Sequence, residues 1–333
     1  MKPTLLVLLL LLLSTPAFAI TITTLDLNAT DDTAIEIAAP VWDGAKSGAV
    51  LIGAFESKFD RKVANKLAGG FRNAMMPSYD LAASLDFGKL FAETLRAEGT
   101  KLGLTMMAQQ EARAPQWTID GTIHGVNVDV QHMGYGSLLF YTYLDVEVRV
   151  TQQDAQAVVT HRIRPARLFV MYNGGMGIGD EVQAALAKIV VVGAQQILAR
   201  LNREHFHAPA LSTMETRLAG LKQIDDRGES ELHAIGLSGV RGASAALASR
   251  LESERDENAR TSIVYALTSL GAEEQVPLLI RRFASEDDDV RYATIIALAN
   301  AGTPEALALI REKGTKDKTT IVRKLSERVL RGQ

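Results

Sequence analysis

Hydrophobic residues alternate with polar ones along three stretches in the middle of the chain. These stretches cover residues 117–130, 144–150 and about 157–171. Strict alternation is typical of β-strands that bury one face, so the pattern predicts an antiparallel sheet. In the first stretch the apolar positions change face at Gly125, which predicts a β-bulge. Between the second and third stretches, the sequence TQQDAQ predicts a hairpin turn.

Helical periodicity surrounds these strands. Apolar residues recur every three or four positions over 87–95, in a helix that we expect to end at Gly99, and again over 182–201. A buried strand at 50–55 precedes the first helix. The order of strand, helix, several strands and helix predicts an α+β domain over residues 49–207, with an antiparallel sheet and helices on one face.

Beyond His207 the alternation stops and a repeat of about thirty residues begins. The segment ARTSIVYALTSLG at 259–271 aligns with VRYATIIALANAG at 290–302. These residues resemble HEAT repeats of the short bacterial kind. Because one helix pair cannot bury its apolar stripe alone, neighbouring pairs must stack. We therefore expect an all-α HEAT-like solenoid over 229–333, after a linker or first partial helix at 208–228.

An aspartate lies four positions before each matching arginine of the repeats. Asp256 precedes Arg260, and Asp287 precedes Arg291. We expect each aspartate to cap the start of its helix and to pair with the arginine along the same helix. This ladder is interpreted as structural.

The predicted α+β domain resembles the small envelope domains of YajG-type and related outer-membrane assembly lipoproteins. The order of elements carries this resemblance, together with the phrase FGKLFAETLRAEG at 87–99. It implies an envelope location and a role in outer-membrane or lipid trafficking. Those families carry a lipidated cysteine that this chain lacks, so a membrane tether is not implied.

The N-terminus has the features of a secretory signal peptide. Lys2 is followed by a leucine-rich run and by the small-residue ending Ala17-Phe18-Ala19. The apolar run is shorter than the roughly 20 residues that cross a bilayer, which favours cleavage before Ile20 over an uncleaved anchor. We expect residues 1–19 to be removed, residues 20–48 to form an N-terminal extension, and the protein to be periplasmic.

Composition excludes several classes of chemistry. The 333-residue chain has no cysteine, which excludes disulfides, thiol nucleophiles and thiolate metal sites. A formal net charge of -3 gives no general attraction to nucleic acid, so no nucleic-acid partner is expected.

The glycine-rich stretch YNGGMGIGDEV, Tyr172 to Val182, invites comparison with phosphate-binding loops. Asp180 and Glu181 follow the glycines at the start of a helix, where carboxylates would repel a phosphate. A repeat domain rather than a strand follows this helix, so no nucleotide or other cofactor is expected. If exposed, Met176 and Ile178 could form an apolar lip that contacts a partner.

The histidines supply the remaining candidate chemistry. Glu204, His205 and His207 could share a metal ion, but their spacing is not that of HExxH and the nearby sequence offers no third ligand type at a familiar spacing. A solvated helix end is the favoured interpretation, with no metal. His161, Arg162 and Arg164 form a candidate contact for an anionic group, although alternating charges are also common on an exposed sheet face. No catalytic set is recognisable, although residues distant in sequence can form one.

Basic residues gather near the end of the chain, where residues 311–331 could meet lipid head groups or an acidic partner. The alternative is a charged capping helix, which solenoids need for solubility. Arg281, Arg282, Arg323 and Lys324 are candidate partner contacts in the repeats.

Together these patterns favour an exported, non-enzymatic adaptor that binds another envelope protein through its HEAT-like repeats. The alternative is an accessory component of an envelope transport or assembly system that binds a small ligand or lipid in the α+β domain. Peripheral membrane association and the oligomeric state stay open.

Overall fold

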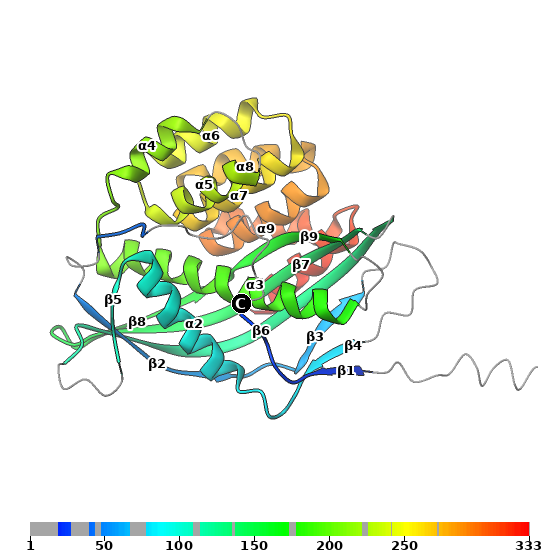
Figure 1. Cartoon of the computed structure of the whole chain (residues 1–333). Coiled ribbons are helices and arrows are strands. Elements are labelled where there is room, and N and C mark those ends of the chain that lie inside the picture. The colour runs from blue at the N-terminus through cyan, green and yellow to red at the C-terminus, as the bar shows by residue number, and fades with distance from the viewer. Residues whose placement is uncertain are drawn as a thin grey trace, which may run out of the picture.

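The computed structural model describes residues 19–27, 40–43, 48–66, 78–108, 114–134, 137–172, 178–221, 226–240, 242–271 and 273–332. Within these residues, one sheet carries two long helices on one face, and an array of shorter helices lies beyond them (Figure 1). The predicted α+β class with a following all-α region is confirmed.

The described residues form one sheet of nine strands. The strands are β1 (Ala19–Ile22), β2 (Ala49–Ser57), β3 (Lys62–Lys66), β4 (Ser78–Leu81), β5 (Thr105–Met107), β6 (Trp117–Gly134), β7 (Ser137–Gln152), β8 (Ala157–Ile163) and β9 (Ala166–Tyr172).

The antiparallel part of the sheet follows the alternating pattern closely. β6 pairs with β7 along almost its whole length, and the register shifts between Ile123 and Gly125, where the bulge was predicted. The third predicted strand is in fact two, β8 and β9, which both pair with β7. Arg164 and Pro165 separate them. Proline has no N–H to donate to a ladder, which explains the interruption.

Apart from the antiparallel pair of β3 with β4, the rest of the sheet departs from the antiparallel expectation. β2 pairs in parallel with both β5 and β6, β3 pairs in parallel with β6, and β1 pairs in parallel with β4. The chain returns from β2 to β5 through the helix α2 (Phe87–Leu102). A connection of that kind leaves the two strands parallel, so the sheet is mixed.

Helix α2 begins and ends at residues with recognisable capping geometry. The Asp86 carboxylate accepts a hydrogen bond from the Lys89 N–H at 2.9 Å. The helix ends at Gly103, which has a φ of 104°. The predicted end at Gly99 is wrong: that glycine lies inside the helix, where a Cβ would lie 2.6 Å from the Met106 sulfur.

Helix α3 (Ile178–Leu201) lies between the sheet and the helical array (Figure 1). Among the described residues, the continuous helix Asp180–Phe206 is long and apolar enough to cross a membrane, and 78% of its apolar window is buried inside the fold. It packs on α2, β7 and β9 from one side and on repeat helices from another. We interpret it as a core helix, because helices buried in a protein core can be as long and as apolar as a membrane-spanning helix.

Parts of the predicted N-terminal extension belong to the core. Ile22, Val41 and Trp42 are buried, and Trp42 forms an isolated bridge with Ala210 in the predicted linker. The predicted signal peptide lies outside the described residues except for Ala19, which begins β1.

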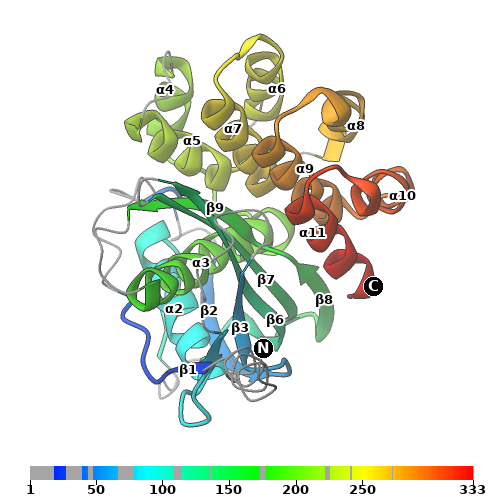
Figure 2. The ribbon, with the colours of Figure 1, turned by 90° about the vertical axis from the view of Figure 1, so that its right-hand side faces the viewer.

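The helical array has two rows, as Figure 2 shows. The inner row faces the α+β domain and the outer row packs chiefly on the inner row. The inner helices are α5 (Asp226–Ser238), α7 (Glu257–Leu270), α9 (Asp288–Ala301) and α11 (Thr320–Arg331); the outer helices are α4 (Thr213–Gly220), α6 (Ala243–Ser253), α8 (Val276–Arg282) and α10 (Pro304–Glu312).

The aspartate–arginine ladder connects neighbouring repeats. Asp256 caps α7 by accepting from the Ala259 N–H at 2.9 Å, as predicted. The predicted cap by Asp287 is wrong, because its side chain accepts no hydrogen bond from the first turn of α9. Arg260 does not pair back along its own helix: it reaches the start of the next repeat and pairs with Asp287. Arg291 pairs with Asp317 at 2.8 Å in the same forward direction. The ladder is therefore structural, and it stabilises contacts between repeats.

Candidate functional site

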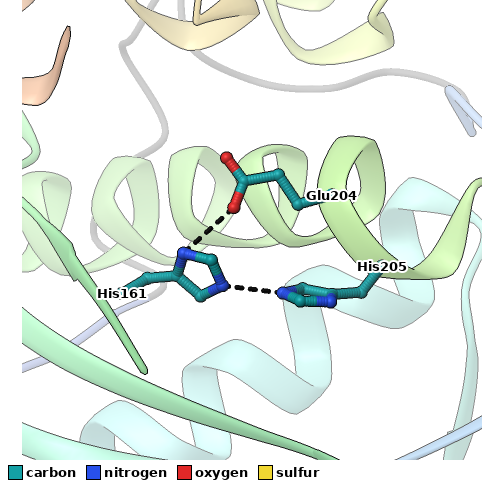
Figure 3. A group of neighbouring side chains, drawn as sticks. All are labelled: His161, Glu204 and His205. Carbon is teal, nitrogen blue, oxygen red and sulfur yellow. Dashed lines mark hydrogen bonds and ion pairs between the residues drawn. The ribbon is translucent and has the colours of Figure 1, made fainter. Parts of the chain in front are cut away.

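Three side chains from separate candidate sets meet beside the edge strand β8 (Figure 3). His161 Nδ1 lies 3.0 Å from Glu204 Oε2, and His161 Nε2 lies 2.7 Å from His205 Nε2. His161 comes from β8, whereas Glu204 and His205 lie in a π-helical turn, Asn202–Phe206, that continues α3. We call these three residues the His–Glu cluster.

The π-helical turn explains how two consecutive residues contact the same histidine. The His207 N–H donates to the Asn202 carbonyl at 2.7 Å, a bond that spans five residues. The Asn202 side chain secures the turn, since its Nδ2 donates to the Ala208 carbonyl at 3.0 Å and its Oδ1 accepts from the Ala208 N–H at 2.8 Å. A π turn is wider than an α turn, so neighbouring side chains diverge less, and such turns often occur at functional sites.

The sheet supplies the other wall of the cluster. His161 is paired with Val148, whose buried side chain lies on the face that the helices cover. The Trp117 ring lies 5.9 Å from the His205 ring and 5.5 Å from the Phe206 ring, centroid to centroid. The cluster is only partly buried, with 16% of the His161 side chain and 22% of the Glu204 side chain exposed. Solvent can therefore reach it.

Glu204 is held in its charged form. Burial opposes ionisation, but the hydrogen bond from His161 and the charges of Arg200 and Arg203 outweigh it and lower the pKa of Glu204 to about 2. Arg200 and Arg203 both contact Oε1, and His161 faces Oε2. The two oxygens thus have separate roles.

The two imidazoles can share one proton. Burial, together with the charge of His161, lowers the pKa of His205. A hydrogen bond between two Nε2 atoms needs one ring to donate and the other to accept, so two protonated rings could not keep this contact. The cluster offers one carboxylate and two imidazoles, with one ligand atom from each within 4.8 Å of the others. Such a set can relay a proton or hold a metal ion.

The structure groups the candidate residues differently from the sequence prediction. Glu204 and His205 do lie together, but His207 is not part of the cluster. Its place is taken by His161, which precedes Glu204 by 43 positions and was predicted to contact an anion. The long separation explains why no third ligand was evident in the nearby sequence.

The other two predicted anion contacts face a carboxylate of the protein itself. Arg162 donates to both oxygens of Asp145 at 2.8 Å, and this pairing raises the pKa of Arg162 despite partial burial. Arg164 is 6% exposed and donates to the Gly332 carbonyl at 3.2 Å. An external anion would have to displace Asp145, which makes the predicted anion contact unfavourable at Arg162.

The predicted partner contacts are also partly engaged within the chain. Lys324 approaches Asp129 at 3.8 Å, and Arg323 donates to the Lys318 carbonyl at 2.9 Å. Arg282 pairs with Glu286, four positions later in the chain. Arg281 differs, because 65% of its side chain is exposed beside Glu252. Met176 lies outside the described residues, as does the side chain of Ile178.

The inner row of helices is docked on the α+β domain through polar contacts that the sequence did not reveal. Tyr141 donates to Asp289 at 2.7 Å, and Tyr292 donates to the Thr142 carbonyl at 2.9 Å. Further contacts are the exchange of two hydrogen bonds between Asn300 and the Arg164 backbone, the ion pair of Arg328 with Asp129, the hydrogen bond of His233 with Gln195, and the stacking of Arg167 over the Tyr265 ring. The motif DDDVRYATIIALANAG thus supplies docking residues as well as repeat packing.

Comparison with known proteins identifies part of the chain. No curated protein matches it. Among solved structures, a Xanthomonas campestris protein of the DUF330 family is 11% identical, with a TM-score of 0.30, and the match covers 54% of this chain and 92% of that chain. A minor lipoprotein from Acinetobacter baumannii is 8% identical, with a TM-score of 0.27 and coverages of 50% and 98%. A PelC dodecamer from Paraburkholderia phytofirmans is 10% identical, with a TM-score of 0.23 and coverages of 46% and 92%.

The repeats give a direct match. Residues 244–331 match the family described as HEAT repeats. This range lies within the predicted solenoid and covers α6 to α11. The C-terminal part of the chain therefore consists of HEAT repeats.

Proposed function

We propose that this protein is an exported adaptor that binds another envelope protein through the outer row of its HEAT repeats. One observation carries the proposal: the inner row is already occupied by the α+β domain of the same chain. HEAT solenoids present extended surfaces that suit protein binding, and here the outer row is the part left accessible.

The outer row has both a hollow and exposed charge. Between α4 and α6 lies a hollow of roughly 270 Å³ with apolar and polar lining. Its lining residues are Leu218, Leu221, Ala246, Leu247, Ser249, Arg250 and Ser253. Farther along the row, Arg281 extends from α8 beside Glu252. An exported partner with an apolar residue and acidic neighbours would complement this surface.

The proposed location rests on the N-terminal sequence. Lys2, the leucine-rich run and the ending Ala17-Phe18-Ala19 have the order of a secretory signal peptide. Cleavage after Ala19 would leave Ile20 to Ile22 paired with β4. Export would bring the adaptor into the same compartment as its envelope partner.

Site-specific photo-crosslinking in cells tests the proposal. A photoreactive amino acid is placed at position 281 on the outer row or at position 149 on the polar face of the sheet. Arg281 and Arg149 are matched, because their side chains are 65% and 58% exposed and each pairs with one surface acid. We expect a crosslink to an envelope protein from position 281 and none from position 149.

The opposite result would contradict the proposal: crosslinks from position 149 alone would move the binding surface to the α+β domain. The full chain is required for this experiment. Separating the repeats would expose the inner row and leave buried partners such as Asp129 without their counterparts.

A second candidate function is ligand binding in the α+β domain, and the His–Glu cluster is the specific observation that favours it. The nature of that ligand is considered next.

A further inference from the structure

We propose that His161, Glu204 and His205 together bind one divalent transition-metal ion of the Zn²⁺ class. This inference is independent of the adaptor function, since it concerns the junction of β8 with the end of α3 rather than the outer row of the solenoid.

The donor set suits such an ion. Two imidazoles and one carboxylate are among the ligand sets that Zn²⁺ uses when a fourth position is left for water or another ligand. Imidazole nitrogen favours zinc, copper, nickel or iron, whereas calcium and magnesium prefer sets made of oxygen alone. The absence of cysteine throughout the chain leaves histidine as its strongest ligand for these metals.

The geometry is close to what the ion requires. With Zn–N distances of about 2.0–2.1 Å, ligand atoms in a tetrahedral site lie about 3.3 Å apart. His161 now faces Glu204 Oε2 through Nδ1, at 3.0 Å, and His205 Nε2 through its other nitrogen, Nε2, at 2.7 Å. Only one of these two nitrogens can bind the ion, so one of the present contacts must open. One ligand atom from each residue already lies within 4.8 Å of the other two. Side-chain rotations that shorten the longest of these distances by up to about 1.5 Å would complete the site.

Two arginines orient the carboxylate of Glu204, and their charges are balanced by two carboxylates. Arg200 and Arg203 contact Glu204 Oε1, and Arg200 also lies 3.3 Å from Glu273. Two guanidiniums therefore face two carboxylates. The arginines orient Glu204 and leave Oε2 directed at His161, in the way that outer contacts commonly orient a metal ligand.

The ion would join parts of the chain that are far apart in sequence. His161 lies on an edge strand whose first residues, 157–160, are exposed, whereas Glu204 and His205 follow the main core helix. A metal at this position would hold the end of α3 against β8. Partial exposure of His161 and Glu204 gives the ion a route from solvent.

Metal titration of the full chain, purified without a histidine tag, tests the proposal. Zn²⁺ affinity is measured by competition with a chromophoric chelator, and Co²⁺ is used as a spectroscopic probe of the coordination. We expect one Zn²⁺ per chain. His161→Asn or His205→Asn should weaken binding by at least about 100-fold, and Glu204→Gln by at least about 10-fold.

His207→Asn is the matched control. His207 lies two residues beyond His205 and has a φ of 53°, a conformation that asparagine adopts more readily than most residues. Its affinity for Zn²⁺ should equal that of the unchanged protein. The proposal is overturned if the unchanged protein binds no Zn²⁺, or if all three histidine variants bind alike.

A measurement on the unchanged protein covers the case in which His161→Asn or His205→Asn does not fold. Diethylpyrocarbonate modifies accessible histidines, and mass spectrometry locates each modified site. We expect Zn²⁺ to protect His161 and His205 while His207 reacts equally with and without the ion. Equal protection of all three, or of none, would contradict the proposed ligands.

Discussion

Replacing Arg328 with methionine should destabilise the whole chain by about 3 kcal/mol, the lower end of the cost of breaking a buried ion pair. Arg328 on α11 pairs with Asp129 on β6, and Asp129 is 0% exposed. Methionine keeps most of the side-chain volume but leaves this carboxylate with fewer partners. Asn127 still donates to it at 2.9 Å, and Lys324 lies 3.8 Å away, which is why the smaller figure is expected.

Urea unfolding followed by circular dichroism measures this cost. Arg281→Met is the control, because Arg281 and Glu252 form an exposed pair whose loss should cost less than about 1 kcal/mol. In the Arg328→Met background, Asp129→Asn should restore part of the stability, since the unpaired buried charge is then gone. If Arg328→Met costs no more than Arg281→Met, the buried pair does not hold the solenoid against the sheet.

The remaining predictions concern acid stability and helix packing. Burial, with a smaller effect from the charge of Arg167, lowers the pKa of His233 in the folded chain to about 3. In the unfolded chain the pKa of this histidine is near 6.5, so below pH 6.5 the unfolded chain binds more protons than the folded chain. Stability should therefore be complete above pH 6.5 and fall by about 3 kcal/mol on acidification to pH 4, and urea unfolding of His233→Gln should show a smaller loss over that range. Gly236→Ala should destabilise the chain by about 1–3 kcal/mol in thermal and urea unfolding, because its Cβ would lie 2.9 Å from the Ala266 Cα; Gly220→Ala, where the Cβ meets nothing within 4 Å, should not.

Local patterns predicted the local parts of the fold. Alternation located β6 and the second half of β7, and the change of face at Gly125 located the bulge, because both depend on side chains that are neighbours along one strand. The first half of β7, residues 137–143, was not predicted. The division of the third stretch was missed although Pro165 signalled it, since a proline within an apparent strand marks an edge or an interruption. The parallel pairing of β2 with β6 joins segments separated by β3, β4, α2 and β5, and no local pattern encodes it.

The candidate site shows the same limit. Sequence analysis named His161 as an anion contact, and it considered Glu204, His205 and His207 as a metal set but favoured a solvated helix end. What unites them is the π-helical turn set by Asn202, together with the approach of α3 to β8. Arg162 was predicted to meet an external anion because it belongs to a basic group with His161 and Arg164. Its partner Asp145 lies on the neighbouring strand, 17 positions earlier, where no local pattern pairs the two. Charges predict a partner of opposite sign, but tertiary structure decides whether that partner belongs to the chain.

The proposed metal site and the docked solenoid are physically connected. Arg200 and Arg203 hold Glu204, and the same two arginines contact Glu273 and the Leu270 carbonyl at the end of α7. An ion that fixes Glu204 would therefore also fix the groups that hold α7 against the end of α3. An ion present at 100 times its Kd would stabilise the folded chain by about 2.7 kcal/mol, close to the cost expected for losing Arg328. Because the inner row is held to the α+β domain at both places, the outer row would be presented to a partner as a rigid surface. Zn²⁺ would thus raise the free energy of unfolding of the full chain, and urea unfolding in the presence of a chelator should show that gain lost.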